Sequence, residues 1–245
     1  MNRNGCEDCL ILAVRRVGDF NKSITCLSDN SYFDAIVYGA FKGKSKNGAN
    51  TELFSFSKLY YYLNPSANSC SIKDSVLIRP FDGIRKTLNG IYKAAAVCEI
   101  IVKTFAGGGE YGPVFKLASE ALKCLDLGKD PDYVIIQFLL RYLELSGNVF
   151  DPSDCSICGK SENGPRYYSY SSADVVCENC IGPDCQVISE GILRYMRFSM
   201  KRDFEKSISI GIDENSKMTL IGVLKRYMED LIGSSINSMT KGAVL

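Results

Sequence analysis

The stretch that decides the fold begins at Asp154-Cys155-Ser156-Ile157-Cys158-Gly159 and is completed by Val176-Cys177-Glu178-Asn179-Cys180. Two Cys-x-x-Cys pairs are separated by eighteen residues, a spacing typical of zinc sites. The pattern therefore predicts one zinc ion per chain, bound by Cys155, Cys158, Cys177 and Cys180. Two disulfides are the alternative, which we disfavour because disulfide frameworks belong to short secreted chains.

The predicted zinc is structural rather than catalytic. A set of four cysteine ligands is closed, whereas catalytic zinc keeps one position open for water, usually beside histidine or carboxylate ligands. The chain contains no histidine, so a zinc hydrolase or deaminase is disfavoured. We expect no catalytic residues and no enzymatic activity. Cys185, Cys6 and Cys9 have no second pair of their own and are interpreted as bystanders.

The composition allows two modest domains and a metal-stapled insert, because 46% of the 245 residues are hydrophobic. The polar opening segment does not resemble a secretory signal, and no apolar run reaches the length of a membrane span. With eleven cysteines, the chain is expected to reside in a reducing cytoplasm, away from membranes. The net charge is only +1, with a slight basic excess in residues 1–80.

The first third of the chain reads as a β-structure. Short apolar or aromatic runs alternate with turn residues, and the expected strands cover residues 9–17, 23–27, 32–41, 53–63 and 71–78. Five strands at this spacing predict a small closed barrel of the oligonucleotide-binding (OB-fold) type, forming a domain over residues 1–81.

The polar loop over residues 42–50 looks superficially like a nucleotide-binding P-loop. Only three residues separate Gly39 from Gly43, one fewer than that motif needs, and residues 46–50 are a poor start for a helix. We therefore exclude nucleotide hydrolysis. The loop is either a solvated hairpin tip or a finger whose lysines contact phosphate, and its sequence alone leaves both possibilities open.

From residue 82 the apolar period becomes helical. The expected helices cover residues 84–105, 114–127, 133–145, 189–206 and 218–232. These predict an all-α domain over residues 82–245 with a zinc-finger insert at 150–185, so the fold class is α+β. The helix at 133–145 is apolar nearly all round, which indicates burial or a partner-binding face. In the fourth helix, Arg194, Arg197 and Lys201 form a basic stripe of the kind that is usually a solvated face.

In this order of parts the chain resembles the RecO family of bacterial recombinational repair proteins, over residues 9–232. The local likeness lies in Tyr38-Gly39-Ala40-Phe41-Lys42, in Ala94-Ala-Ala-Val-Cys-Glu99-Ile, in Phe138-Leu-Leu-Arg141-Tyr-Leu-Glu144-Leu-Ser-Gly147 and in the two cysteine pairs. The family's basic loop usually carries paired arginines and a proline, whereas this chain has Lys42-Gly-Lys-Ser-Lys46. The positively charged surface expected of this loop is therefore weaker than is usual in the family.

The resemblance implies a non-enzymatic mediator of DNA repair and homologous recombination. Such a protein binds single- and double-stranded DNA, anneals complementary strands, and helps to load RecA onto single strands coated by single-stranded DNA-binding protein. The implied partners are DNA, RecR and the C-terminal tail of that coating protein, with RecA acting indirectly and the protein associated with the nucleoid.

The residues expected to carry these roles combine cations for phosphate with rings for bases. The predicted DNA contacts are Arg15, Arg16, Lys22, Lys42, Lys44 and Lys46. The aromatic residues among them are Tyr32, Phe41, Phe54 and Phe56, for each of which a place in the barrel core is the alternative. A partner pocket is predicted at Phe138 and Arg141, because an acidic peptide with an apolar end needs an apolar pocket rimmed by a cation. A zinc-stapled protein–protein adaptor that does not touch nucleic acid remains the alternative function.

Overall fold

The structure is a computed structural model that describes residues 4–64, 69–104, 110–148, 153–161 and 165–241. By internal contacts the chain divides into two compact units, Met1–Leu127 and Gly128–Leu245. The barrel ends at Arg79, two residues before the predicted domain boundary, whereas the first compact unit extends to Leu127. Among the described residues, no helix combines the length and the apolar content needed to span a bilayer.

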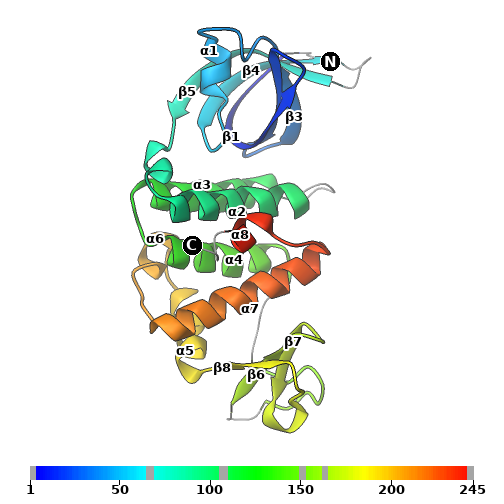
Figure 1. The fold of residues 1–245 in the computed structure, drawn as a ribbon, viewed down its shortest axis with the longest axis vertical. Helices are drawn as coiled ribbons and strands as arrows, with labels where there is room; N and C mark the ends of the chain where they lie inside the picture. The colour runs from blue at the N-terminus through cyan, green and yellow to red at the C-terminus, as the bar shows by residue number, and fades with distance from the viewer. Residues whose placement is uncertain (1–3, 65–68, 105–109, 149–152, 162–164, 242–245) are drawn as a thin grey trace. The chain divides into compact units, whose positions relative to one another are not determined.

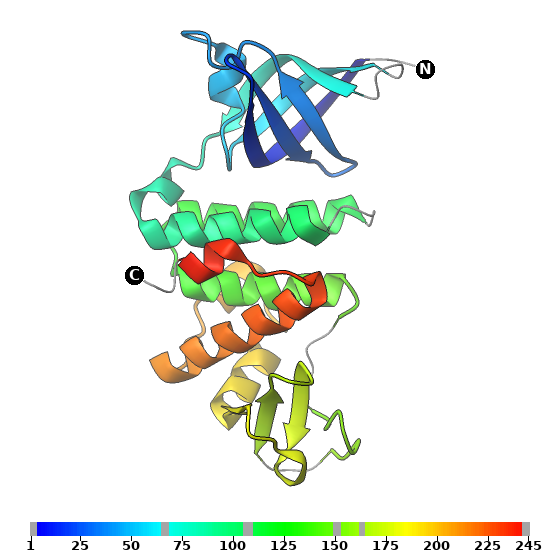
Figure 2. The same ribbon diagram turned by 45° about the vertical axis from the view of Figure 1, so that its right-hand side comes forward.

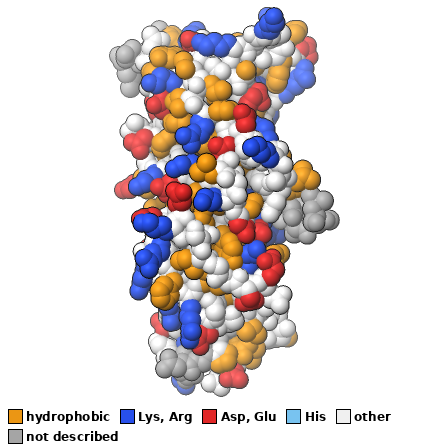
Figure 3. Space-filling model, turned by 90° about the vertical axis from the view of Figure 1, so that its left-hand side faces the viewer, with side chains coloured by type: hydrophobic (Ala, Val, Ile, Leu, Met, Phe, Trp, Pro, Cys, Tyr) orange, Lys and Arg blue, Asp and Glu red, His pale blue; other side chains and the backbone are white. Residues whose placement is uncertain are grey.

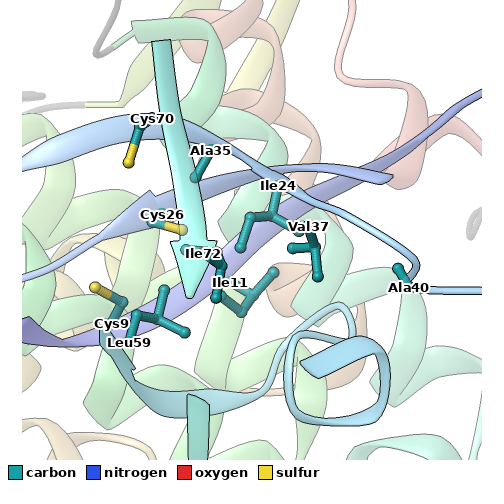
Figure 4. Packing of buried hydrophobic residues seen from close by; sticks show 10 residues of the cluster. All are labelled: Cys9, Ile11, Ile24, Cys26, Ala35, Val37, Ala40, Leu59, Cys70 and Ile72. Carbon is teal, nitrogen blue, oxygen red and sulfur yellow. The ribbon is translucent and has the colours of Figure 1, made fainter. Parts of the chain in front are cut away.

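The first unit contains the predicted five-stranded barrel (Figure 1). Its strands are β1 (Asn4–Val17), β2 (Asn21–Leu27), β3 (Tyr32–Val37), β4 (Phe56–Asn64) and β5 (Ser69–Arg79). They close in the order β1-β2-β3-β5-β4, with β1 pairing antiparallel to β4 and β3 parallel to β5. Alternate residues point inward and fill the interior, as the side chains of Ile11, Ile24 and Leu59 show in Figure 4.

The connection between β3 and β4 differs from the prediction. The third strand ends at Val37 rather than at residue 41, and a short helix, α1 (Lys46–Asn50), occupies a segment that we predicted to be a poor helix start. Ser45 caps this helix by accepting a hydrogen bond from the Gly48 amide at 3.2 Å. A Cβ at Gly48 would overlap the carbonyl of Ala40, so glycine is needed for close packing rather than as a helix breaker.

Two long helices complete the first unit. After η1 (Asp82–Lys86) come α2 (Leu88–Thr104) and α3 (Tyr111–Asp126). The side chain of Asp126 accepts a hydrogen bond from the Gly83 amide at 2.8 Å, which ties the end of α3 to the segment that leaves the barrel. The ring of Phe115 lies 5.9 Å from that of Phe56 in β4. The predicted end of the first helix, Phe105, lies outside the described residues.

The second unit is helical, with a small sheet inserted in the sequence between α4 and α5, so the α+β fold class is confirmed. Its helices are α4 (Pro131–Leu145), α5 (Glu190–Ser199), α6 (Phe204–Ser207), α7 (Glu214–Ile232) and α8 (Asn237–Lys241). The sheet, in the order β7-β6-β8, contains β6 (Arg166–Ser169), β7 (Asp174–Cys177) and β8 (Cys185–Ile188), with η3 (Glu178–Cys180) after β7. Figures 1 and 2 show it as a module distinct from the helices. The helix predicted over 189–206 is interrupted after Ser199.

Candidate metal centre and nucleic-acid interface

The four cysteines predicted to bind zinc converge at one end of the small sheet. Cys177 ends β7, Cys180 lies in η3, and Cys155 and Cys158 lie on the segment before β6. All four Sγ atoms lie within 4.8 Å of one another, and the sulfurs of Cys158 and Cys177 are 3.7 Å apart. Sulfurs about 2.3 Å from a tetrahedral metal lie about 3.8 Å from each other. The donor set therefore fits a four-coordinate metal ion.

The electrostatics of these thiols also favour a cation. Burial raises the pKa of the Cys155 thiol, but hydrogen bonds from the backbone amides of Cys158, Cys177 and Ile157 outweigh it and lower the pKa to about 6. Burial and the neighbouring thiols raise the pKa of Cys180 to about 12. The backbone amides thus stabilise Cys155 as a thiolate, whereas ionisation of a second thiol such as Cys180 would place two negative charges beside each other. A bound divalent cation would relieve this repulsion.

The turn after the first cysteine pair explains why the motif has glycine at position 159. Gly159 has a φ of +68°, in the left-handed region, and its amide donates to the Cys155 carbonyl at 2.8 Å. Cys185 packs against the thiol cluster without joining the four-sulfur group, and its Sγ accepts a hydrogen bond from the Gly182 amide at 3.3 Å.

The predicted DNA-binding cations meet aromatic rings at one end of the barrel. The Arg16 guanidinium donates to the carbonyls of Gly18 and Asp19, at 3.2 and 3.0 Å, and lies 5.2 Å from the centre of the Phe41 ring. The Lys42 ammonium lies 5.5 Å from the centre of the Phe20 ring. These contacts join the β1–β2 hairpin to the loop after β3.

We call this area the barrel-tip surface and define it by its exposed cations and rings. Its members are Arg15, Arg16, Phe20, Tyr38, Phe41, Lys42 and Lys44. The rings are well exposed, at 53% for Phe20, 68% for Tyr38 and 46% for Phe41. The amide of Phe41 donates to the Phe20 carbonyl at 3.0 Å, so the two loops are fixed to each other. Phe20 and Tyr38 were not predicted as DNA contacts, although each lies in or beside a turn, where an aromatic side chain is seldom buried.

Two of the predicted lysines are engaged elsewhere. Lys22 as a DNA contact is wrong, because its side chain is fully buried and its Nζ donates to the Gly48 carbonyl at 2.7 Å and to Glu52 at 2.8 Å. Lys46 is exposed but pairs with Asp74 at 2.9 Å, and this hydrogen bond lowers the pKa of the Asp74 carboxyl.

The other predicted aromatic residues do not belong to the barrel-tip surface. Phe54 is buried, which agrees with the core alternative, whereas Tyr32 and Phe56 are half-buried.

The predicted partner pocket is contradicted by the packing of α4. Phe138 is fully buried, and its ring stacks on Tyr142 with the ring centres 5.4 Å apart. An Nη atom of Arg141 donates to the carbonyls of Arg202 and Ser199 at 2.7 and 3.4 Å. Arg141 therefore supports the backbone at the end of α5, and the two residues do not form a surface pocket.

Comparison with known proteins gives a consistent result. Residues 85–240 match the family model described as "Recombination protein O C terminal". A DNA repair protein RecO of Bacillus subtilis (strain 168) is 24% identical over 239 residues, covering 95% of this chain and 91% of the relative. The same-named protein of Clostridium novyi (strain NT) is 27% identical over 195 residues, covering 79% and 75%. That of Mycoplasma mycoides is 24% identical over 225 residues, covering 90% of each chain.

Proposed function

Because the chain belongs to the RecO family of DNA repair proteins, we propose that it acts in recombinational repair by binding DNA directly, without catalysing a reaction. The observation that carries this proposal is the barrel-tip surface, where exposed rings and cations from two loops are held together. Cations neutralise phosphates and rings stack on bases, which are the two requirements of a single-strand binding surface.

The proposal extends to the steps that follow binding. We propose that the protein binds both single- and double-stranded DNA, anneals complementary strands, and helps RecA to assemble on single strands coated by single-stranded DNA-binding protein. RecR and the acidic tail of the coating protein are the proposed protein partners. The basis for these steps is family membership, and the buried Phe138 supplies no pocket for the tail.

We further propose that the four-thiol cluster binds one structural Zn²⁺ ion. Cys155, Cys158, Cys177 and Cys180 would supply all four ligands and leave no open position for a reacting water. The role of the ion would be to hold the small sheet together, because the buried residues of its hydrophobic cluster are Val176 and two of the ligands themselves, Cys155 and Cys177. Metal analysis of the purified protein by mass spectrometry should find one zinc per chain.

A salt titration of oligonucleotide binding tests the proposed activity. If about four phosphates are contacted, the log–log slope of affinity against salt on a single strand should be near −3. Replacing Arg16 and Lys42 together with glutamine should make the slope shallower by about 1.4. Arg226→Gln is the matched control, because this exposed arginine of α7 pairs with Asp230 in the other unit. Absence of binding at low salt would contradict the proposal and favour the adaptor alternative.

A further inference from the structure

A second group of exposed cations lies close in the sequence to an exposed ring in the second unit. Helix α5 buries Ile192, Tyr195 and Met196, whereas its opposite side and the turn that follows are exposed. We call this area the α5 patch and define it as Arg197, Phe198, Lys201 and Arg202. Phe198 is 63% exposed, and all three cations are exposed as well. On the face that Figure 3 presents, Lys and Arg side chains lie among hydrophobic side chains and Asp and Glu side chains.

The charges of this patch are not neutralised locally. The adjacent Arg194 pairs with Glu190 at 3.0 Å, and Lys206 pairs with Asp203 at 2.9 Å. Within the part of the chain that the structure describes, no carboxylate forms an ion pair with Arg197, Lys201 or Arg202. Three positive charges within four residues of Phe198 are therefore available to bind an anionic ligand.

The backbone beneath the patch is held in place. The Arg202 amide donates to the Ser199 carbonyl at 3.0 Å, which forms the turn after the helix. Both of these residues also accept hydrogen bonds from Arg141 of α4 through their carbonyls. At the middle of the helix, the Tyr195 hydroxyl accepts a hydrogen bond from Gln137 at 2.8 Å. A ligand that meets this surface would therefore find the helix and turn already ordered.

The simplest alternative is a solvated basic face. Cations near a helix C-terminus interact favourably with the helix dipole, which would account for Arg197 without any ligand. A single exposed apolar residue is also ordinary. Neither effect explains why an exposed phenyl ring lies one, three and four residues from cations that form no ion pair among the described residues, because a solvated face gains nothing from the ring.

We propose that the α5 patch is a second binding site for single-stranded nucleic acid, with Phe198 stacking on a base and Arg197, Lys201 and Arg202 contacting phosphates. A nucleic-acid strand fits better than an acidic peptide, because an apolar peptide anchor needs a concave pocket, whereas a base can stack on a projecting ring. The inference rests on the proposed DNA-binding function but uses residues of the other unit. Two sites would allow one chain to hold two strands, as annealing requires.

Three variants of the full-length, metal-bound protein test this site. They are Arg197→Gln with Lys201→Gln, Phe198→Leu, and the barrel-tip pair Arg16→Gln with Lys42→Gln, and Arg226→Gln serves as the control. Binding of labelled oligothymidylate and of a labelled duplex is measured by fluorescence anisotropy across a salt series, together with the number of oligonucleotides bound per chain. Thermal melting of each variant verifies that it remains folded.

Removing two cations of the α5 patch should make the salt slope on the single strand shallower by about 1.4. Phe198→Leu should weaken oligothymidylate binding on the order of tenfold and leave duplex binding nearly unchanged, since paired bases cannot stack on the ring. The barrel-tip pair should retain one bound oligonucleotide per chain.

Three outcomes would overturn the second site, and the first two can be told apart from failure of the proposed function. If the α5 variants bind like Arg226→Gln while the barrel-tip pair loses all binding, the DNA-binding function stands and the α5 patch is only a solvated face. If the α5 variants keep oligonucleotide binding but lose binding of a labelled acidic peptide, titrated in the same anisotropy assay, the patch binds a protein instead. If the wild-type protein binds no oligonucleotide at low salt, both proposals fail.

Discussion

Replacing Lys22 with methionine should destabilise the barrel and leave DNA binding unchanged. Lys22 belongs to β2, where it lies on the same face as the buried Ile24 and Cys26. Its ammonium group reaches the Gly48 carbonyl of α1 and the carboxylate of Glu52, so it joins β2 to the connection between β3 and β4. Methionine has a similar length and apolar stem but cannot donate these hydrogen bonds.

The expected loss follows from the two contacts. A hydrogen bond to a charged group contributes about 1.5–3 kcal/mol, but the cost of burying the ammonium offsets part of this gain. Glu52 is more than half exposed, so water can replace its lost donor, whereas the buried Gly48 carbonyl keeps only weak contacts to Thr51 at 3.4 Å. We expect a net destabilisation of about 2 kcal/mol, which corresponds to a fall in Tm of roughly 4–8 °C.

Lys42→Met is the matched variant, since it removes the same charge from the same unit. Lys42 is exposed and contacts the Phe20 ring rather than a carboxylate. Loss of one phosphate contact should weaken single-strand binding about fivefold at roughly 0.1 M salt and make the salt slope shallower by about 0.7. Its Tm should stay within about 1–2 °C of the wild-type value, as for most surface substitutions.

Calorimetry and the anisotropy titration together decide between the two roles. If Lys22→Met melts like the wild type and weakens DNA binding, the buried role of Lys22 is wrong, because a buried lysine cannot reach a phosphate. If Lys42→Met lowers Tm and leaves binding unchanged, the surface role of Lys42 is wrong. If Lys22→Met lowers Tm without weakening DNA binding, and Lys42→Met weakens DNA binding without lowering Tm, then burial rather than charge determines the role of each lysine.

Three further predictions concern the four cysteines of the proposed metal centre and two residues of strand β1. Cys177→Ser should lose zinc and unfold the small sheet, seen by metal analysis and limited proteolysis; a well-folded, zinc-bound variant would contradict the four-thiolate centre. Gly5→Ala should cost about 1–3 kcal/mol in a denaturant titration, because its Cβ would overlap the Tyr61 ring. Burial opposes ionisation of Glu7, but hydrogen bonds from hydroxyl groups, including those of Ser28 and Tyr61, lower the pKa of its carboxyl group. The ionised carboxylate therefore stabilises the fold above the unfolded-state pKa of about 4.3, and this stabilisation is lost as the pH falls through the lower folded-state pKa. Glu7→Gln should therefore be less stable than the wild type at neutral pH, and the difference should shrink as the pH falls below about 4, as measured by denaturant titration at several pH values.

The features predictable from the sequence are those encoded by local spacing. The two cysteine pairs predicted the thiol cluster because each pair presents its sulfurs through its own turn. Strand alternation could also have shown that Lys22 points inward, since Ile24 and Cys26 share its face. The role of Arg141 was not predictable, because the carbonyls that it supports belong to residues 58 and 61 positions further along the chain.

Helix α1 was missed for a related reason. Its five residues have poor intrinsic helix propensity, and the helix depends on contacts made after the barrel has closed. Asn50 donates to the Ser75 carbonyl of β5 at 2.9 Å, and Lys46 pairs with Asp74 on the same strand. Tertiary contacts of this kind override local preference and cannot be read from a segment in isolation.

The metal centre and the α5 patch are connected through the chain. Strand β8 pairs with β6, which in turn pairs with β7, the strand that ends at Cys177. One residue after β8, Ser189 caps α5 by accepting a hydrogen bond from the Ile192 amide at 3.3 Å. The strand order therefore links the thiol cluster to the residue at which α5 begins. A metal ion bound by the four thiols would order this connection without any catalytic chemistry, so loss of the metal should also disturb the α5 patch.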